Sequence, residues 1–255
     1  IVSGTATIAD TSSPTTGVTV AAGDTVTLRW TISNGSCTDS TDDVVLTNDA
    51  LPTTAAAGTD QTQCNTPGFT MAANTPTVGT GIWSIVSGTA TIADTSSPTT
   101  GVTVAAGDTV TLRWTISNGS CTDSTDDVVL TNDALPVAGL TSSDADNTIC
   151  AGESVTFTGT GGDAYEFFID GVSVQAESAT ATYTTAGLSN GQEVTVRVVN
   201  TTTGCESLST GIIMSVNVGP DNDSDGISDD CDPDDDNDGN PDGTDANPLV
   251  PTTAD

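Results

Sequence analysis

The stretch TVTLRWTI at residues 109–116 decides the fold. Its apolar and polar side chains alternate, and this period of two is typical of a β-strand with one buried face. The buried face would carry Val110, Leu112, Trp114 and Ile116, and the opposite face Thr109, Thr111, Arg113 and Thr115. The pair Asn118–Gly119 follows, which predicts a hairpin leading into a second strand through residues 127–130.

The same sequence occurs twice in the chain. Residues 1–52 are identical to residues 85–136, so Ile1 recurs as Ile85 and Trp30 as Trp114. Self-similarity at a fixed period is typical of modules joined in series. Residues 64–71 and 81–84 each indicate an early strand of the second copy. The first copy has no such strands ahead of it in this sequence.

The number and spacing of these strands predict the fold class. About seven short strands, turns rich in Gly and Pro, and a Cys…Trp…Cys order favour an all-β fold of tandem immunoglobulin-like sandwiches. A later stretch follows the same plan, because Val194, Val196 and Val198 alternate and Asp170–Gly171 suits a hairpin turn. We expect a partial module at 1–53, a complete one at 54–136, a divergent one at 137–219, an acidic segment at 220–249 and a linker at 250–255.

The six cysteines indicate the compartment. Most of a module separates Cys64 from Cys121 in the sequence, and the same is true of Cys150 and Cys205. Metal sites would show short Cys-x-x-Cys pairs, so these wide spacings favour one disulfide per module, Cys64–Cys121 and Cys150–Cys205. Cys37 and Cys231 would then have no partner within the chain. Disulfides are typical of oxidising, extracellular settings, and reduced core cysteines are the alternative.

The segment 221–245 is crowded with aspartates, and they alternate with other residues. The calcium loop of EF-hand type takes ligands at positions 1, 3, 5, 7, 9 and 12, with Gly at position 6. Two such frames occur in succession, one around Gly226 and one around Gly239. The predicted metal ligands are Asp221, Asp223, Asp225, Ile227, Asp229 and Asp232, and then Asp234, Asp236, Asp238, Asn240, Asp242 and Asp245. Ca²⁺ is the predicted cofactor, because it prefers oxygen ligands and neutralises clustered carboxylates; a solvated acidic linker is the alternative.

Two resemblances follow from these motifs. The pattern DxDxDGxxDxxD followed by DxDxDGxxD resembles thrombospondin type 3 repeats, which implies that residues 220–249 wrap around calcium ions. Such repeats commonly pair their cysteines, and Cys231 departs from that pattern. The stretches GIWSIVSGTATI, TVTLRWTISNGSC and DDVVLTN resemble tandem repeats of very large surface proteins of gliding and marine Bacteroidetes, including gliding adhesins exported by type IX secretion. This second resemblance implies display on the bacterial cell surface and adhesion, but it supplies no binding residues.

Charge and composition exclude several classes of function. The chain has 35 acidic residues against three arginines, for a net charge of −32. Nucleic acids and anionic membranes require a basic surface, and no apolar run approaches the ~20 residues that span a bilayer. The chain has no His and no Lys, which removes the usual general bases and Schiff-base nucleophiles. We therefore expect neither nucleic-acid binding, nor membrane insertion, nor enzyme activity.

These observations predict a structural stalk of an extracellular bacterial surface adhesin or filament, stiffened by calcium. Its partners would be neighbouring modules or copies of the same protein, together with a surface ligand such as a polysaccharide. One alternative is a filament subunit completed by donor-strand exchange. Another is the accessory region of a secreted polysaccharide-degrading enzyme. Whether the first module is completed by its own chain or by another molecule stays open at this stage.

Overall fold

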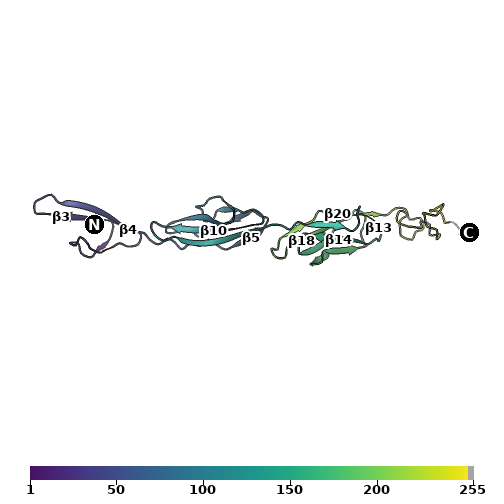
Figure 1. Ribbon diagram of the computed structural model, residues 1–255, viewed down its shortest axis with the longest axis horizontal. Helices are drawn as coiled ribbons and strands as arrows, with labels where there is room; N and C mark the ends of the chain where they lie inside the picture. Colours follow the sequence, from purple (N-terminus) through teal and green to yellow (C-terminus); the bar gives the residue numbers. More distant parts are fainter. Residues whose placement is uncertain (252–255) are drawn as a thin grey trace. The chain divides into compact units, whose positions relative to one another are not determined.

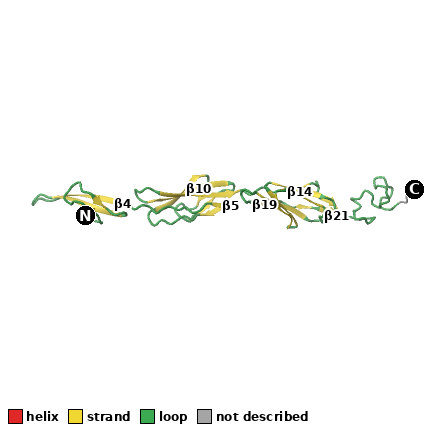
Figure 2. Ribbon diagram, turned by 90° about the horizontal axis from the view of Figure 1, so that it is seen from below, coloured by secondary structure: helices red, strands yellow, loops and turns green. Residues whose placement is uncertain are grey.

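The computed structural model describes residues 1–251, all of them in strands, turns and loops (Figure 2). No helix that could cross a membrane occurs among them. The chain divides into two compact units, Ile1–Asp133 and Ala134–Asp255 (Figure 1). The five-segment division made from the sequence stays a prediction. The last residues of its expected linker, 252–255, lie outside the described part of the chain.

The first unit contains one complete immunoglobulin-like sandwich. Its strands are β5 (Gln61–Cys64), β6 (Gly68–Thr70), β7 (Thr80–Ser87), β8 (Thr91–Ile92), β9 (Gly101–Thr103), β10 (Asp108–Ser117) and β11 (Ser124–Asp133). One sheet has the order β5-β11-β10-β7 and the other the order β6-β9-β8. The first strand, β5, pairs in parallel with the last strand, β11, and all other pairs are antiparallel. Seven short strands in two facing sheets confirm the predicted fold class.

The alternation in β10 builds the core of this sandwich. Val110, Leu112, Trp114 and Ile116 are all fully buried, as their period of two predicts. Trp114 packs against Trp83 of β7, with ring centroids 5.0 Å apart. Gly81 lies directly beneath the indole of Trp114, where an added Cβ would overlap the ring. The two tryptophans therefore join the neighbouring strands β7 and β10 on the inner face of the sheet.

The first sequence copy forms only part of a sandwich, which we call the open half-sandwich. It consists of β1 (Thr7–Ile8), β2 (Val18–Thr19), β3 (Asp24–Ile32) and β4 (Ser40–Asn48). Strands β3 and β4 form the same hairpin, in the same register, as β10 and β11. Among the described residues, no strand corresponding to β5 or β6 pairs with it. Its inner face is consequently left partly exposed.

The second unit contains a divergent sandwich with the same strand plan. Its strands are β12 (Gly139–Ser142), β13 (Thr148–Cys150), β14 (Val155–Thr160), β15 (Ala164–Ile169), β16 (Val172–Ser178), β17 (Thr182–Thr185), β18 (Glu193–Val199), β19 (Glu206–Leu208), β20 (Ile212–Ile213) and β21 (Ser215–Asn217). The sheets are β12-β14-β17 and β16-β15-β18-β19, and β13 pairs in parallel with β21 as β5 does with β11. The predicted turn at Asp170–Gly171 joins β15 to β16, with positive φ at both residues.

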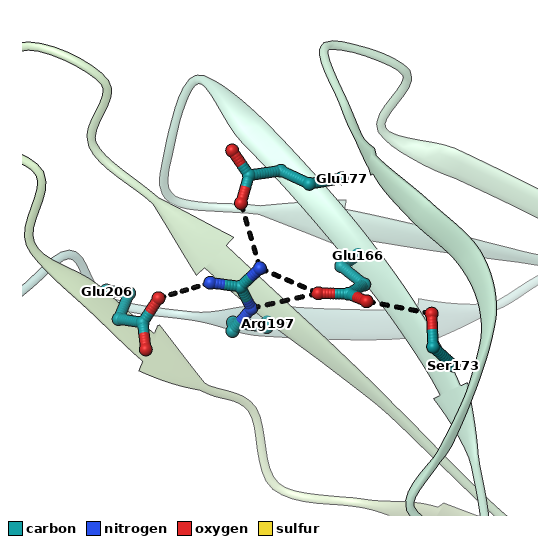
Figure 3. A network of polar contacts seen from close by, with 5 residues as sticks. All are labelled: Glu166, Ser173, Glu177, Arg197 and Glu206. Atoms are coloured by element: carbon teal, nitrogen blue, oxygen red, sulfur yellow. Dashed lines mark hydrogen bonds and ion pairs between the residues drawn. The ribbon is translucent and has the colours of Figure 1, made fainter.

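Each of the three arginines pairs with carboxylates across a sheet. Arg29 contacts Asp43, and Arg113 contacts Asp127, through two hydrogen bonds each. Arg197 on β18 donates to carboxylates of three other strands, those of Glu166, Glu177 and Glu206 (Figure 3). The hydroxyl of Ser173, followed by the guanidinium of Arg197, holds the pKa of Glu166 below its usual value. The few basic residues of this acidic chain thus lie at fixed positions between strands.

The structure corrects the predicted disulfide Cys64–Cys121. Cys121 is a free thiol, whereas Cys64 is disulfide-bonded, so the two are not partners. Cys64 lies opposite Asp133 at the end of β11, and Cys121 precedes the start of β11. The length of this strand separates the two ends by about 30 Å, far beyond the ~7 Å Cα separation that a disulfide tolerates. The wide spacing in sequence therefore does not indicate a disulfide, because the two cysteines lie at opposite poles of one sandwich.

The predicted disulfide Cys150–Cys205 is wrong for the same reason. Cys150 bonds to Cys231 in the acidic segment, with Cα atoms 5.9 Å apart, and Cys205 is disulfide-bonded elsewhere. Cys205 follows the turn at one end of β18, whereas Cys150 lies opposite Asn217 of β21. Cys37 is an exposed free thiol. The expectation that Cys231 has no partner in the chain is also wrong. The disulfides themselves agree with the extracellular setting that the cysteines predicted.

Candidate metal centre

The acidic segment folds as two consecutive loops with the same internal hydrogen bonds. In the first loop the N–H of Gly226 donates to Asp221, at 3.1 Å, and in the second the N–H of Gly239 donates to Asp234, at 3.0 Å. Three further N–H donors recur. In the first loop Asp225 donates to Asp223, Ile227 to Asp225 and Asn222 to Asp229. In the second loop Asp238 donates to Asp236, Asn240 to Asp238 and Asp235 to Asp242. Both glycines have positive φ, so the sharp turn expected at position 6 is present twice.

Each loop gathers its first three alternating carboxylates. One oxygen from each of Asp221, Asp223 and Asp225 lies within 4.8 Å of the others, and the same holds for Asp234, Asp236 and Asp238. We call these groups the first and the second triad. The backbone N–H groups that fix each carboxylate come from the loop itself, two or five positions further on. The arrangement could hold a metal ion in each loop.

Several carboxylate oxygens of the loops are buried without a hydrogen-bond partner. They are Oδ2 of Asp223, Oδ1 of Asp234, Oδ1 of Asp235, Oδ2 of Asp236 and Oδ2 of Asp245. In Asp223, Asp234 and Asp236 the other oxygen accepts a backbone N–H, so each side chain is oriented by one oxygen and leaves the second unsatisfied. A buried carboxylate oxygen without a partner is costly, and a cation is the group that would satisfy several at once.

Burial and mutual repulsion perturb the acids of the second loop. The side chain of Asp236 is only 5% exposed, and burial, followed by the charges of neighbouring aspartates, raises its pKa although the N–H of Asp238 opposes the change. Burial raises the pKa of Asp235 to about 6, with further contributions from the nearby charges of Asp242 and Asp229. Both shifts have the direction expected where carboxylates converge without a compensating positive charge.

The remaining predicted ligands have different places. Asp229 and Asp242 each accept a backbone N–H that closes their loop, at 2.8 and 2.9 Å. Asp232 accepts the N–H of Asp234, and Asp245 accepts the N–H of Asn247. Within the described residues, none of these four carboxylates belongs to a triad. Ile227 and Asn240 donate their N–H groups to the third aspartate of the triads, which holds position 7 close to the predicted site.

Sequence reasoning missed two residues of the segment. Asp235 occupies an even position of its loop, outside the alternating ligand pattern, yet its side chain is 9% exposed and one oxygen has no partner. Ser228 is similarly buried, and its hydroxyl has no partner. For Asp235 the one sequence signal was that both loops have a polar residue at position 2, Asn222 and Asp235. In the structure the N–H of each of these residues closes its loop.

The acidic segment is attached to the second sandwich by a covalent bond and a hydrogen bond. The disulfide Cys150–Cys231 joins the end of β13 to the chain between the two triads. The amide of Asn217, at the end of β21, donates to Asp230 at 3.0 Å. Both contacts come from the pole of the sandwich where its last strand ends. The loops are therefore held beside the sandwich in addition to following it in the chain.

No known protein family and no curated protein matches this chain. Solved arrays of Ig domains are similar to it in structure. The N-terminal four Ig domains of Dscam1 isoform 6.9 share 10% identity over 69% of this chain and 51% of theirs, with a TM-score of 0.35. The insect immune protein hemolin shares 14% over 75% and 56%, with a TM-score of 0.37. The N-terminal eight Ig domains of the Down Syndrome Cell Adhesion Molecule, isoform 1.30.30, share 11% over 77% and 28%, with a TM-score of 0.43. This chain spans about half the length of the first two structures.

Proposed function

We propose that this chain is a length of stalk from an extracellular bacterial surface adhesin or filament, stiffened by calcium. The observation that carries the proposal is the pair of aspartate loops with matching hydrogen bonds and unsatisfied buried oxygens. The exact recurrence of residues 1–52 and the disulfides add to it, because repeated sandwich modules and disulfide bonds suit a long extracellular protein. The five segments predicted from the sequence are the modules of this stalk.

Calcium is the cation that the donor set favours. The triads offer only carboxylate oxygens, and backbone carbonyls at position 7 would add further hard ligands. Zinc would call for nitrogen or sulfur, and the chain has no His while Cys231 is in a disulfide. Bound calcium would neutralise the carboxylates that now repel one another. The loops would then hold a fixed conformation, while the disulfide to Cys150 transmits their position to the sandwich.

A stiff stalk supports adhesion by holding a binding surface away from the cell. Its partners in this proposal are neighbouring modules or copies of the same protein, and the surface ligand, such as a polysaccharide, binds elsewhere. Extracellular calcium near ~10⁻³ M would keep sites of ~10⁻⁴–10⁻³ M affinity substantially filled. The aspartate loops would then make the stalk stiff outside the cell, and the stalk would be flexible at these loops wherever calcium is low.

Limited proteolysis with and without a chelator tests this proposal. With calcium, cleavage between Gly219 and Pro248 should be slow; chelation should speed it at least severalfold and leave the sandwiches intact. Asp225→Ala and Asp238→Ala should each reproduce the effect of chelation in their own loop. Asp123→Ala makes the same change of charge on an exposed side chain outside the acidic segment and serves as the matched control. Equal cleavage with and without chelator would remove the calcium function and leave a solvated acidic linker.

The exposed face of the open half-sandwich favours a second candidate. A sandwich that lacks edge strands can accept a strand from another molecule, as filament subunits do in donor-strand exchange. In that case the chain would be a filament subunit whose length grows by strand addition. The two candidates differ in whether the covering strands come from the same chain.

A further inference from the structure

The open half-sandwich and the complete sandwich provide an internal comparison, because residues 1–52 and 85–136 are identical. Equivalent side chains nevertheless differ sharply in exposure. The pairs are Trp30 at 40% and Trp114 at 0%, Ile32 at 61% and Ile116 at 0%, and Val44 at 50% and Val128 at 1%. The sequence of the face is therefore that of a core, and only its covering strands are missing. An exposed apolar face of this kind marks a docking surface.

The open face surrounds a hollow of about 380 Å³. Its apolar lining includes Ile8, Val18, Leu28, Trp30 and Val44. In the complete sandwich the corresponding space is filled by Phe69 of β6, by Met71 directly after it and by Trp83 of β7. The occupant that fits the hollow is thus a segment with the sequence of residues 53–84, which already fills the identical face one repeat later.

The register of the complete sandwich fixes where the cysteine of such a segment would lie. In the parallel pair of β5 and β11, Cys64 lies opposite Asp133, and the next N–H, of Asn65, donates to the carbonyl of Asp133 at 2.8 Å. Asp49 is the residue of the first copy that corresponds to Asp133. A covering segment would therefore place its cysteine opposite Asp49, about 4.8 Å away between Cα atoms.

The free thiol of Cys121 lies at this same place. Its Sγ is 3.4 Å from the carbonyl oxygen of Asp49 and 3.4 Å from that of Ala50. The loop that carries it is fixed there, because the N–H of Ser120 donates to the Asp49 carboxylate at 2.8 Å and the Asn118 amide donates to the Ala50 carbonyl at 2.7 Å. The thiol and the incoming cysteine would thus meet within the reach of a disulfide.

The second unit shows a bond from the equivalent position. Cys150 ends β13 opposite Asn217 of the last strand, as Cys64 ends β5 opposite Asp133. Cys150 is bonded to Cys231, which follows its sandwich in the chain. A cysteine at this pole therefore bonds to the segment that comes next, and Cys121 belongs to the segment that comes next after the open half-sandwich.

We propose that the open face binds a segment with the sequence of residues 53–84, joined directly ahead of Ile1, and that the cysteine of this segment forms a disulfide with Cys121. A covalent bond would then link each module of the array to the following one. Two thiols lose two protons and two electrons to a small-molecule disulfide such as oxidised glutathione, which becomes two thiols, and one S–S bond forms. The segment in a second copy of the chain is not the occupant, because its strands β5, β6 and β7 are already paired in its own sandwich.

The test uses the full chain with a second copy of residues 53–84 added ahead of Ile1, refolded in a glutathione redox buffer. Alkylation of the folded protein, followed by reduction and cleavage at the arginines, separates Cys37 (in the fragment 30–113) from Cys121 (in the fragment 114–197). Cys121 should be protected by its bond to the added cysteine, and Cys37 should still be open to alkylation. Acrylamide quenching of Trp30 should be lost, since the other two tryptophans of the original chain are already buried. A matched control replaces only the added cysteine by serine: Trp30 should still be protected, and Cys121 should remain open to alkylation.

Three results would overturn the inference. A bond from the added cysteine to Cys37 would show that the register is wrong. A Trp30 that stays as accessible to acrylamide as in the original chain would show that the segment does not bind the open face. A dimer of the original chain that protects Trp30 would show that a second copy covers the face. None of these readouts depends on calcium, so they stand apart from the test of the aspartate loops.

Discussion

The two copies of one sequence allow the same substitution to be made in two structural settings. Trp114 is fully buried against Trp83, whereas Trp30 is 40% exposed and has no aromatic neighbour among the described residues. We expect Trp114→Ala to lower the free energy of unfolding of the complete sandwich by about 3–5 kcal/mol, the range for truncating a buried tryptophan. Trp30→Ala should remove only about three fifths of a transfer term of about 1.5–3 kcal/mol, or about 1–2 kcal/mol, and should leave no cavity.

Hydrogen exchange measured by mass spectrometry separates the two effects within the intact chain. Only peptides that contain position 30 or 114 are useful, because the substitution gives the two otherwise identical copies different masses. Peptides from β10 should lose protection in Trp114→Ala relative to Trp30→Ala, whereas peptides from β3 should differ little between the two variants. The sequence on both sides of each tryptophan is the same, so effects on the unfolded chain largely cancel in the comparison. Equal losses in the two variants would refute the reasoning, because they would mean that the covering strands contribute nothing around Trp114.

Three further predictions concern other parts of the molecule. Gly81→Ala should destabilise the complete sandwich by about 1–3 kcal/mol in urea denaturation, because a Cβ has no room beneath the indole of Trp114. Replacing Cys150 by serine frees Cys231 and opens a loop of 81 residues, which should cost about 4–5 kcal/mol by loop entropy and make the acidic segment exchange amide hydrogens faster; unchanged exchange would contradict this. Because the pKa of Glu166 is lowered in the folded state, its contribution to stability is present above the unfolded pKa of about 4.3 and is lost as the pH falls through the folded value. Glu166→Gln should therefore flatten the acid limb of the denaturation profile below about pH 4.3.

The sequence predicted local features well, because each depends on neighbours in the chain. The alternation of Val110, Leu112, Trp114 and Ile116 was enough to place a strand and its buried face. The alternating aspartates predicted both triads, since a turn at a glycine brings positions 1, 3 and 5 together whatever the rest of the chain does. The same period explains why Asp235 was missed, because it lies between two ligand positions and is buried by the fold of the segment.

Features that depend on distant parts of the chain could not be predicted in the same way. The disulfide pairs were wrong because spacing in sequence does not reveal at which pole of a sandwich a cysteine lies. That information comes from the parallel pairing of the first and last strands, which places Cys64 and Cys150 where the last strand ends. The exposure of Trp30 is a similar case, since its sequence is that of a buried residue and only the absence of covering strands changes its surroundings.

Calcium titration of the intact chain by calorimetry tests the central claim most directly. We predict saturable binding of at least two ions per chain, with the heat of one loop lost in Asp223→Ala and that of the other in Asp236→Ala. Both side chains contribute a buried oxygen without a hydrogen-bond partner, so their removal should weaken binding, whereas Asp123→Ala, on an exposed side chain outside the segment, should not. No heat of binding at millimolar calcium, or the same isotherm in all three variants, would contradict the claim that these loops are calcium sites.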